Sequence, residues 1–97
     1  MLKLLKIVGD SLTPNFEHGD FVLVSKIPFL FRSPSPGDVI AFHQPGYGLL
    51  IKRIQEVNSD GKLKVIGTLP ESVDSRVFGA VRQEDMIGKV VWHIRKA

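Results

Sequence analysis

Apolar and polar residues alternate with a period of two along most of the chain. This alternation is typical of strands that bury one face. Glycine and proline interrupt it at short intervals, and no repeat or long helical pattern appears. We therefore predict a small, mostly β fold of antiparallel strands with little helix. The predicted strands are Asp20–Val24, Asp38–His43, Leu49–Val57, Lys62–Ile66 and Lys89–Ile94.

Two connecting segments have distinctive sequences. Asn58-Ser59-Asp60-Gly61 joins two predicted strands, and Asp-Gly supplies the positive φ of a tight turn, so Leu49 to Ile66 is predicted to be a β-hairpin. In the segment Ile27 to Pro36, apolar residues precede alternating serine and proline. It is predicted to be an irregular loop whose apolar tip, Pro28 to Phe31, either contacts a partner or folds inward.

Composition limits the function classes. A chain of 97 residues suits one domain, so residues 1–97 are predicted to share one core and one site. The absence of cysteine excludes disulfides, thiolate metal sites and cysteine nucleophiles. No run approaches the roughly 18 apolar residues of a membrane span, so we expect a soluble chain without a transmembrane anchor. The net charge of +3 is spread along the chain, and we expect no nucleic-acid partner because a concentrated basic stripe is missing.

One serine lies in a turn suited to nucleophilic chemistry. In Gly9-Asp10-Ser11-Leu12-Thr13-Pro14, the glycine permits close backbone approach and the proline restricts how the chain leaves. The Ser11 amide could then face a substrate oxyanion. An ordinary Ser/Thr turn explains the same residues.

A serine nucleophile needs a base, which in most serine proteases is a histidine. The three histidines, His18, His43 and His93, lie in a turn or near strand ends, without an acidic neighbour in a recognisable pattern. A histidine triad is therefore not indicated.

Lys52 is the more informative candidate base. The alternation places it on the drier strand face, together with Leu50 and Ile54. Burial can lower the lysine pKa of about 10.4 by several units, which allows the amine to accept a proton near neutral pH. The alternative is that the ammonium reaches water along its flexible stem.

A polar segment, Gly67 to Arg76, follows the predicted hairpin. A serine hydroxyl there could orient the lysine amine, and Asp74 with Arg76 could brace the loop as a partly buried ion pair. A solvated serine-rich loop is the alternative.

The serine turn, the lysine strand and the polar segment follow one another along the chain in the order found in the type I signal peptidase family of Ser/Lys serine proteases. The resemblance to this family covers nearly the whole chain. Residues 9–14 resemble its nucleophile box, Gly-x-Ser-Met-x-Pro, and residues 50–54 resemble its lysine box. Residues 19–24 and 36–40 resemble intervening strands, and residues 72–79 resemble its Ser-x-Asp-Ser-Arg-x-x-Gly box.

The resemblance implies a signal-peptidase-like catalytic core in which Ser11 is the nucleophile, Lys52 is the general base and Ser72 orients the lysine amine. A protein or peptide substrate would bind in an extended conformation along neighbouring strands. No metal or cofactor is implied.

The resemblance also assigns supporting roles. Gly9 and Asp10 would shape the nucleophile turn beside the oxyanion region, and Asp74 and Arg76 would be structural braces. The sequence departs from the family at Leu12, where methionine is usual, and at residues 67–70, where Gly-Asp-Asn is typical. Gly9 stands where some members place a serine that assists the oxyanion hole.

The short chain and the proline-rich spacer before Pro36 are most like the small anchorless maturation protease of nickel-type superoxide dismutase. Such an enzyme removes an N-terminal extension from a cytoplasmic precursor. The resemblance therefore implies a cytoplasmic protein, with peripheral membrane contact through Pro28 to Phe31 as the alternative. Two other functions fit the same features: a self-cleaving repressor-type Ser/Lys protease, and a non-catalytic β-module that binds peptide or membrane.

Overall fold

The computed structural model describes residues 2–7, 16–67 and 73–95. Their strands form one six-stranded antiparallel sheet, and helix among them is limited to α1, Ser75–Phe78, and the 3-10 turns Ile27–Leu30 and Gln83–Asp85. The predicted mostly β fold with little helix is confirmed. The strands are β1 Leu2–Lys6, β2 Phe21–Ser25, β3 Val39–Gln44, β4 Gly48–Val57, β5 Leu63–Ile66 and β6 Met86–Ile94.

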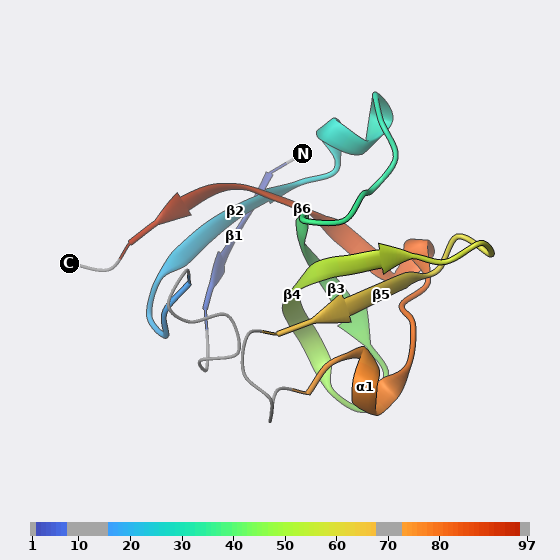
Figure 1. Ribbon diagram of the computed structural model, residues 1–97. Helices are drawn as coiled ribbons and strands as arrows, with labels where there is room; N and C mark the ends of the chain where they lie inside the picture. Colours follow the sequence, from blue (N-terminus) through green and yellow to red (C-terminus); the bar gives the residue numbers. More distant parts are fainter. Residues whose placement is uncertain (1, 8–15, 68–72, 96–97) are drawn as a thin grey trace.

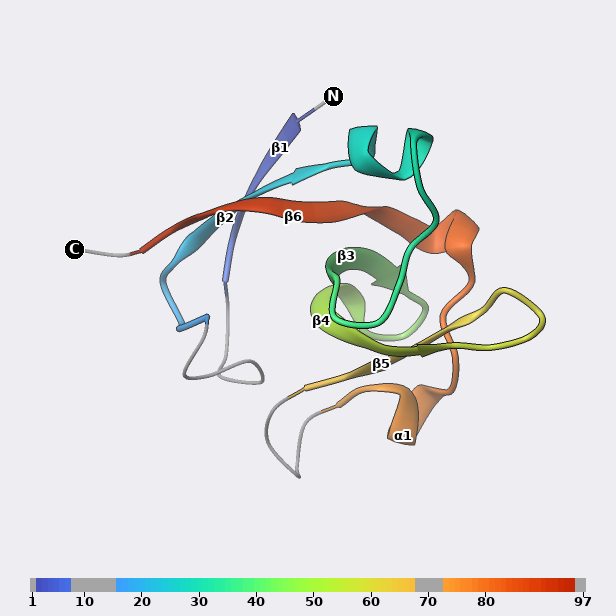
Figure 2. The same ribbon diagram turned by 45° about the horizontal axis from the view of Figure 1, so that its top comes forward.

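The strand order is β1-β2-β6-β3-β4-β5 (Figure 1). The last strand, β6, therefore lies in the middle of the sheet and joins the β1–β2 pair to the β3–β4–β5 meander. Figure 2 shows β6 running across the molecule, with β1 and β2 beside one half of it and the meander curled beside the other. β2 pairs with both β1, near the start of the chain, and β6, near its end.

The sheet buries apolar side chains on both of its faces. Ile40 and Ala41 are successive residues of β3, so their side chains point to opposite faces, and both are fully buried. Each belongs to a different core cluster. The first comprises Ile40, Phe42, Ile54, Leu63, Val65, Val81 and Met86, and the second comprises Ile7, Val22, Val24 and Ala41.

The predicted β-hairpin is present as β4 and β5. Gly61 has φ of +87°, and its amide donates to the Asn58 carbonyl at 2.9 Å. The Asn58 amide in turn donates to the Lys62 carbonyl at 2.9 Å, which closes the turn.

All five predicted strands are present, although β6 begins three residues earlier than predicted. The edge strand β1 was not predicted.

The segment after β2 both folds inward and protrudes. Its 3-10 turn contributes Phe29 to the first core cluster, whereas Leu30 and Phe31 are 76% and 85% exposed. Arg32 then anchors the segment by two hydrogen bonds to the Asp38 carboxylate, each of 2.9 Å. The Pro28 to Phe31 tip therefore presents two large apolar side chains to solvent.

Candidate functional site

Lys52 lies on the buried face of β4. It retains 4% of its surface exposed, lies opposite Ile40 in the β3–β4 ladder and shares its face with Ile54. The prediction that this lysine is buried is thus confirmed. Desolvation lowers the pKa of Lys52, the nearby Asp74 carboxylate raises it, and the Arg76 guanidinium lowers it again, with a net decrease. A lowered pKa increases the fraction of neutral amine that can accept a proton.

The Asp74 carboxylate organises the segment next to Lys52. It is fully buried, and it accepts hydrogen bonds from the Gly67 amide at 2.9 Å and the Arg76 amide at 3.0 Å. The Arg76 side chain adds bonds of 2.9 Å from Nε and 2.7 Å from Nη2, and the latter is an ion pair. Burial opposes ionisation of the carboxyl, but the Arg76 and Gly67 donors outweigh it and lower the pKa of Asp74 to about 2.

These contacts tie α1 to the end of β5. Asp74 caps the amino end of α1 by accepting from the Arg76 amide, while the Ser75 hydroxyl accepts from the Val65 amide at 2.8 Å. The bond from the Gly67 amide to Asp74 joins the residue after β5 to the residue that caps α1, and the charges of Asp74 and Arg76 act on Lys52.

The other predicted site residues, Gly9, Asp10, Ser11 and Ser72, lie outside the described residues. The structure does define the base of the segment that carries Ser11. The Ile7 amide donates to the Asp20 carbonyl at 2.7 Å, and the Gly19 amide donates to the Ile7 carbonyl at 2.9 Å. These bonds extend the pairing of β1 and β2 as far as Ile7 and Gly19, the residues that flank the stretch containing Ser11.

A second buried carboxylate stands at that base. Asp20 is 1% exposed, and its Oδ2 lies 2.6 Å from Nε2 of His93 on β6 and accepts from the Glu17 amide at 3.1 Å. The Phe16 ring stacks on the imidazole with ring centroids 4.5 Å apart. Sequence patterns gave His93 no acidic neighbour because its partner is 73 residues away along the chain. Only the central position of β6 brings the two together.

Within the described part of the chain, no group of three or more His, Cys, Asp and Glu side chains is arranged to hold a metal ion. None of the helices described there has the length and apolar character that crossing a membrane requires.

Sequence comparison with known proteins assigns this chain to a family. The family model described as Peptidase S24-like matches residues 1–91, and the chain belongs to this family. A curated protein named "Probable signal peptidase I-1", from Synechocystis sp., is 29% identical over 132 residues, which cover 89% of this chain and 67% of that protein. The aligned region is longer than this chain, so the relative contains segments inserted between the matched parts.

Family and relative together indicate a serine peptidase-type hydrolase with a protein substrate. This agrees with the class expected from the ordered motifs in the sequence.

Proposed function

We propose that residues 1–97 form a single catalytic domain of a serine endopeptidase in which Ser11 is the nucleophile and Lys52 is the general base. The observation that carries the proposal is the burial of Lys52. It is 4% exposed and lies opposite Ile40 of the first core cluster, and its lowered pKa favours the neutral amine. A lysine in such surroundings is suited to accept a proton, whereas a binding module gains nothing from desolvating an ammonium group.

The chemistry proceeds in two halves. Neutral Nζ of Lys52 takes the proton from Oγ of Ser11 as the oxygen attacks the scissile carbonyl carbon. The resulting oxyanion accepts a hydrogen bond from the Ser11 amide in a turn shaped by Gly9 and Asp10. When the C–N bond breaks, the leaving amine takes the proton from Nζ, and an acyl-enzyme remains. Neutral Lys52 then removes a proton from water as the water oxygen attacks the ester carbon. When the ester C–O bond breaks, Nζ returns the proton to Oγ of Ser11 and the acid is released.

Ser72 is proposed to orient the amine of Lys52. It precedes Asp74 by two residues, and Asp74 is fixed by Arg76 and by the Gly67 amide. Asp74 and Arg76 are therefore proposed as structural braces, which keep the segment of Ser72 beside the lysine without contacting substrate. A hydroxyl held in this way would accept a hydrogen bond from Nζ and direct its lone pair to Ser11.

The substrate is proposed to be a precursor protein from which an N-terminal extension is removed, such as that of nickel-type superoxide dismutase. Support comes from the family, the signal-peptidase relative and the compact chain, which omits segments inserted in that relative. The substrate would lie extended beside the strands near the site. No observation favours the self-cleaving repressor over this function.

The protein is proposed to act in the cytoplasm. The alternative is peripheral membrane contact through Pro28 to Phe31, where Leu30 and Phe31 are exposed. Co-sedimentation with liposomes tests the contact. Binding that is lost in Leu30→Ser/Phe31→Ser would support it, and wild-type protein that stays in the supernatant would contradict it.

Cleavage of a nickel superoxide dismutase precursor, followed by mass spectrometry of the new N-terminus, tests the function. We expect Ser11→Ala and Lys52→Met to abolish cleavage, while Lys64→Met, which changes an exposed lysine on β5, retains it. Full activity in either of the first two variants would contradict the dyad. A wild-type enzyme that cuts other extended peptides but not this precursor would contradict only the substrate.

A further inference from the structure

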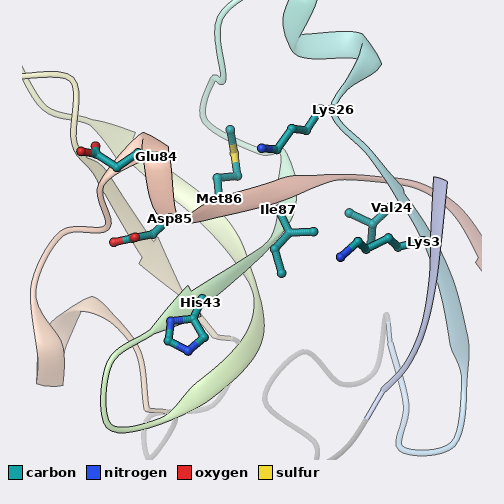
Figure 3. A pocket seen from close by; sticks show the side chains of 8 residues that line it. All are labelled: Lys3, Val24, Lys26, His43, Glu84, Asp85, Met86 and Ile87. Carbon is teal, nitrogen blue, oxygen red and sulfur yellow. The ribbon is translucent and has the colours of Figure 1, made fainter. Parts of the chain in front are cut away.

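A hollow of about 520 Å³ lies away from Lys52, between β1, β2, β3 and the start of β6 (Figure 3). His43 lines it and follows Ile40 by three residues on β3, so its side chain points to the opposite sheet face from Ile40 and Lys52. Its volume is in the range of binding pockets for small groups or side chains. The hollow is therefore separate from the proposed catalytic lysine.

The floor of the hollow is apolar and its walls are charged. Val24 and Met86 are buried beneath it, and Ile87 extends the same surface. The ammonium groups of Lys3 and Lys26 extend toward these apolar side chains from one side (Figure 3). Such a site fits a ligand with an apolar body and an anionic group.

The charges in the hollow are unevenly compensated. Among the described residues, neither Lys3 nor Lys26 forms an ion pair. On the far side, Asp85 is paired with Arg82 by bonds of 3.0 and 3.2 Å, so its charge is largely neutralised. Glu84 is left as a single negative charge at that rim, and its carboxylate turns away from the lysines in Figure 3. An anionic group would therefore be drawn to the lysine side and repelled from the Glu84 side.

The hollow also lies where a bound substrate could reach it. Lys3 belongs to β1, the strand at one edge of the sheet, and Ser11 follows the end of this strand. A substrate segment extended along β1 advances about 3.4 Å per residue, so the distance from Ile7 to Lys3 corresponds to about four substrate residues. Side chains beyond that point would meet Lys3 and Lys26.

We propose that this hollow is an exosite that binds an acidic side chain, flanked by apolar residues, of the protein substrate several residues from the scissile bond. The inference rests on the proposed endopeptidase function. Carboxylate recognition here would increase affinity for the substrate without taking part in bond cleavage.

Direct binding separates the exosite from catalysis. We would use the full chain carrying Ser11→Ala and two blocked octapeptides, one alternating leucine with glutamate and one alternating leucine with glutamine. We expect the glutamate peptide to bind about tenfold more tightly at low ionic strength, with the preference shrinking as salt is added. Lys3→Gln/Lys26→Gln should remove the preference, and Glu84→Gln should increase it.

The matched control is Lys62→Gln/Lys64→Gln, which removes two exposed lysines near and on β5 and should keep the preference. Equal binding of the two peptides, or equal loss in both double variants, would overturn the exosite. Acetylglutamate that competes as strongly as the peptide would also overturn it, in favour of a site for small carboxylates. Failure of the wild type to cleave any peptide would instead contradict the endopeptidase function, because the binding assay does not depend on cleavage.

Discussion

Lys52 on β4 lies directly opposite Ile40 on β3, and neither side chain retains more than 4% of its surface exposed. An ammonium group in this position has lost most of its hydration, and desolvation is the largest influence on its pKa. The fold thus holds a lysine where its neutral form is favoured. Such a residue lowers stability, which is common where a side chain serves a reaction.

Replacing this lysine by a neutral side chain of similar length should stabilise the fold. In wild-type protein, the unfolded lysine takes up a proton as the pH falls below 10.5 while the folded lysine resists it. Stability therefore decreases from pH 10.5 down to the lowered pKa. We expect Lys52→Met to be more stable than wild type at pH 7, as measured by urea denaturation.

The gain should shrink as the pH is raised toward 10.5, because both states of the wild type then carry neutral lysine. Lys64→Met should change stability by less than about 0.5 kcal/mol at either pH. A Lys52→Met variant that is less stable than wild type at pH 7 would contradict a desolvated amine.

The ion pair of Asp74 with Arg76 should contribute measurably to stability. Because the pKa of Asp74 is about 2 in the folded protein against 3.8 ordinarily, its contribution is fully present above pH 3.8 and is lost as the pH falls toward 2. The difference corresponds to roughly 2 kcal/mol. We expect Asp74→Asn to lose about this amount at pH 7 in urea denaturation, and to show a weaker loss of stability in acid.

The exposed pair of Arg82 with Asp85 provides the control, because its removal in Arg82→Gln should change stability much less than Asp74→Asn does. If Asp74→Asn and Arg82→Gln were equally mild, the brace beside Lys52 would lack the proposed role.

The short contact between His93 and Asp20 should matter for both stability and activity. His93→Ala leaves a buried carboxylate without this partner, and we expect a loss of about 2 kcal/mol. His93→Gln, which keeps a hydrogen-bond donor, should recover part of it. Since the pair stands at the base of the Ser11 segment, kcat/KM for peptide cleavage should fall in the same order.

Exposed His43 at the end of β3 is the matched position, and His43→Ala should stay within about 0.5 kcal/mol of wild type. Equal unfolding free energies for His93→Ala and His43→Ala would show that the Asp20 contact contributes nothing.

Local patterns in the sequence account for most of the fold. The hairpin of β4 and β5 was predictable because two alternating strands flank a turn whose positive φ is supplied by Gly61. The burial of Lys52 followed from the same alternation. By contrast, β1 was not predictable by period, because its Leu2 and Leu4 are exposed and it is held by pairing with β2. An alternating apolar pattern indicates a strand with one buried face, so it does not identify an edge strand whose apolar residues are exposed.

Long-range contacts were beyond the reach of patterns. The pair of Asp20 with His93 depends on β6 inserting between β2 and β3, which no local signal specifies. The start of β6 was missed for a related reason. At Gly88 a Cβ atom would lie 2.7 Å from the Ser25 backbone, so a glycine needed for close strand approach interrupts the apolar pattern.

Titration of Lys52 itself tests the proposed dyad most directly. NMR of protein with carbon-13 at the lysine Cε positions, with the Lys52 signal assigned by its loss in Lys52→Met, reports the protonation of each amine between pH 5 and pH 11. We expect Lys52 to titrate below 10.5, the ordinary lysine value, in line with its lowered pKa. A Lys52 signal that titrates at or above 10.5 would contradict a neutral general base.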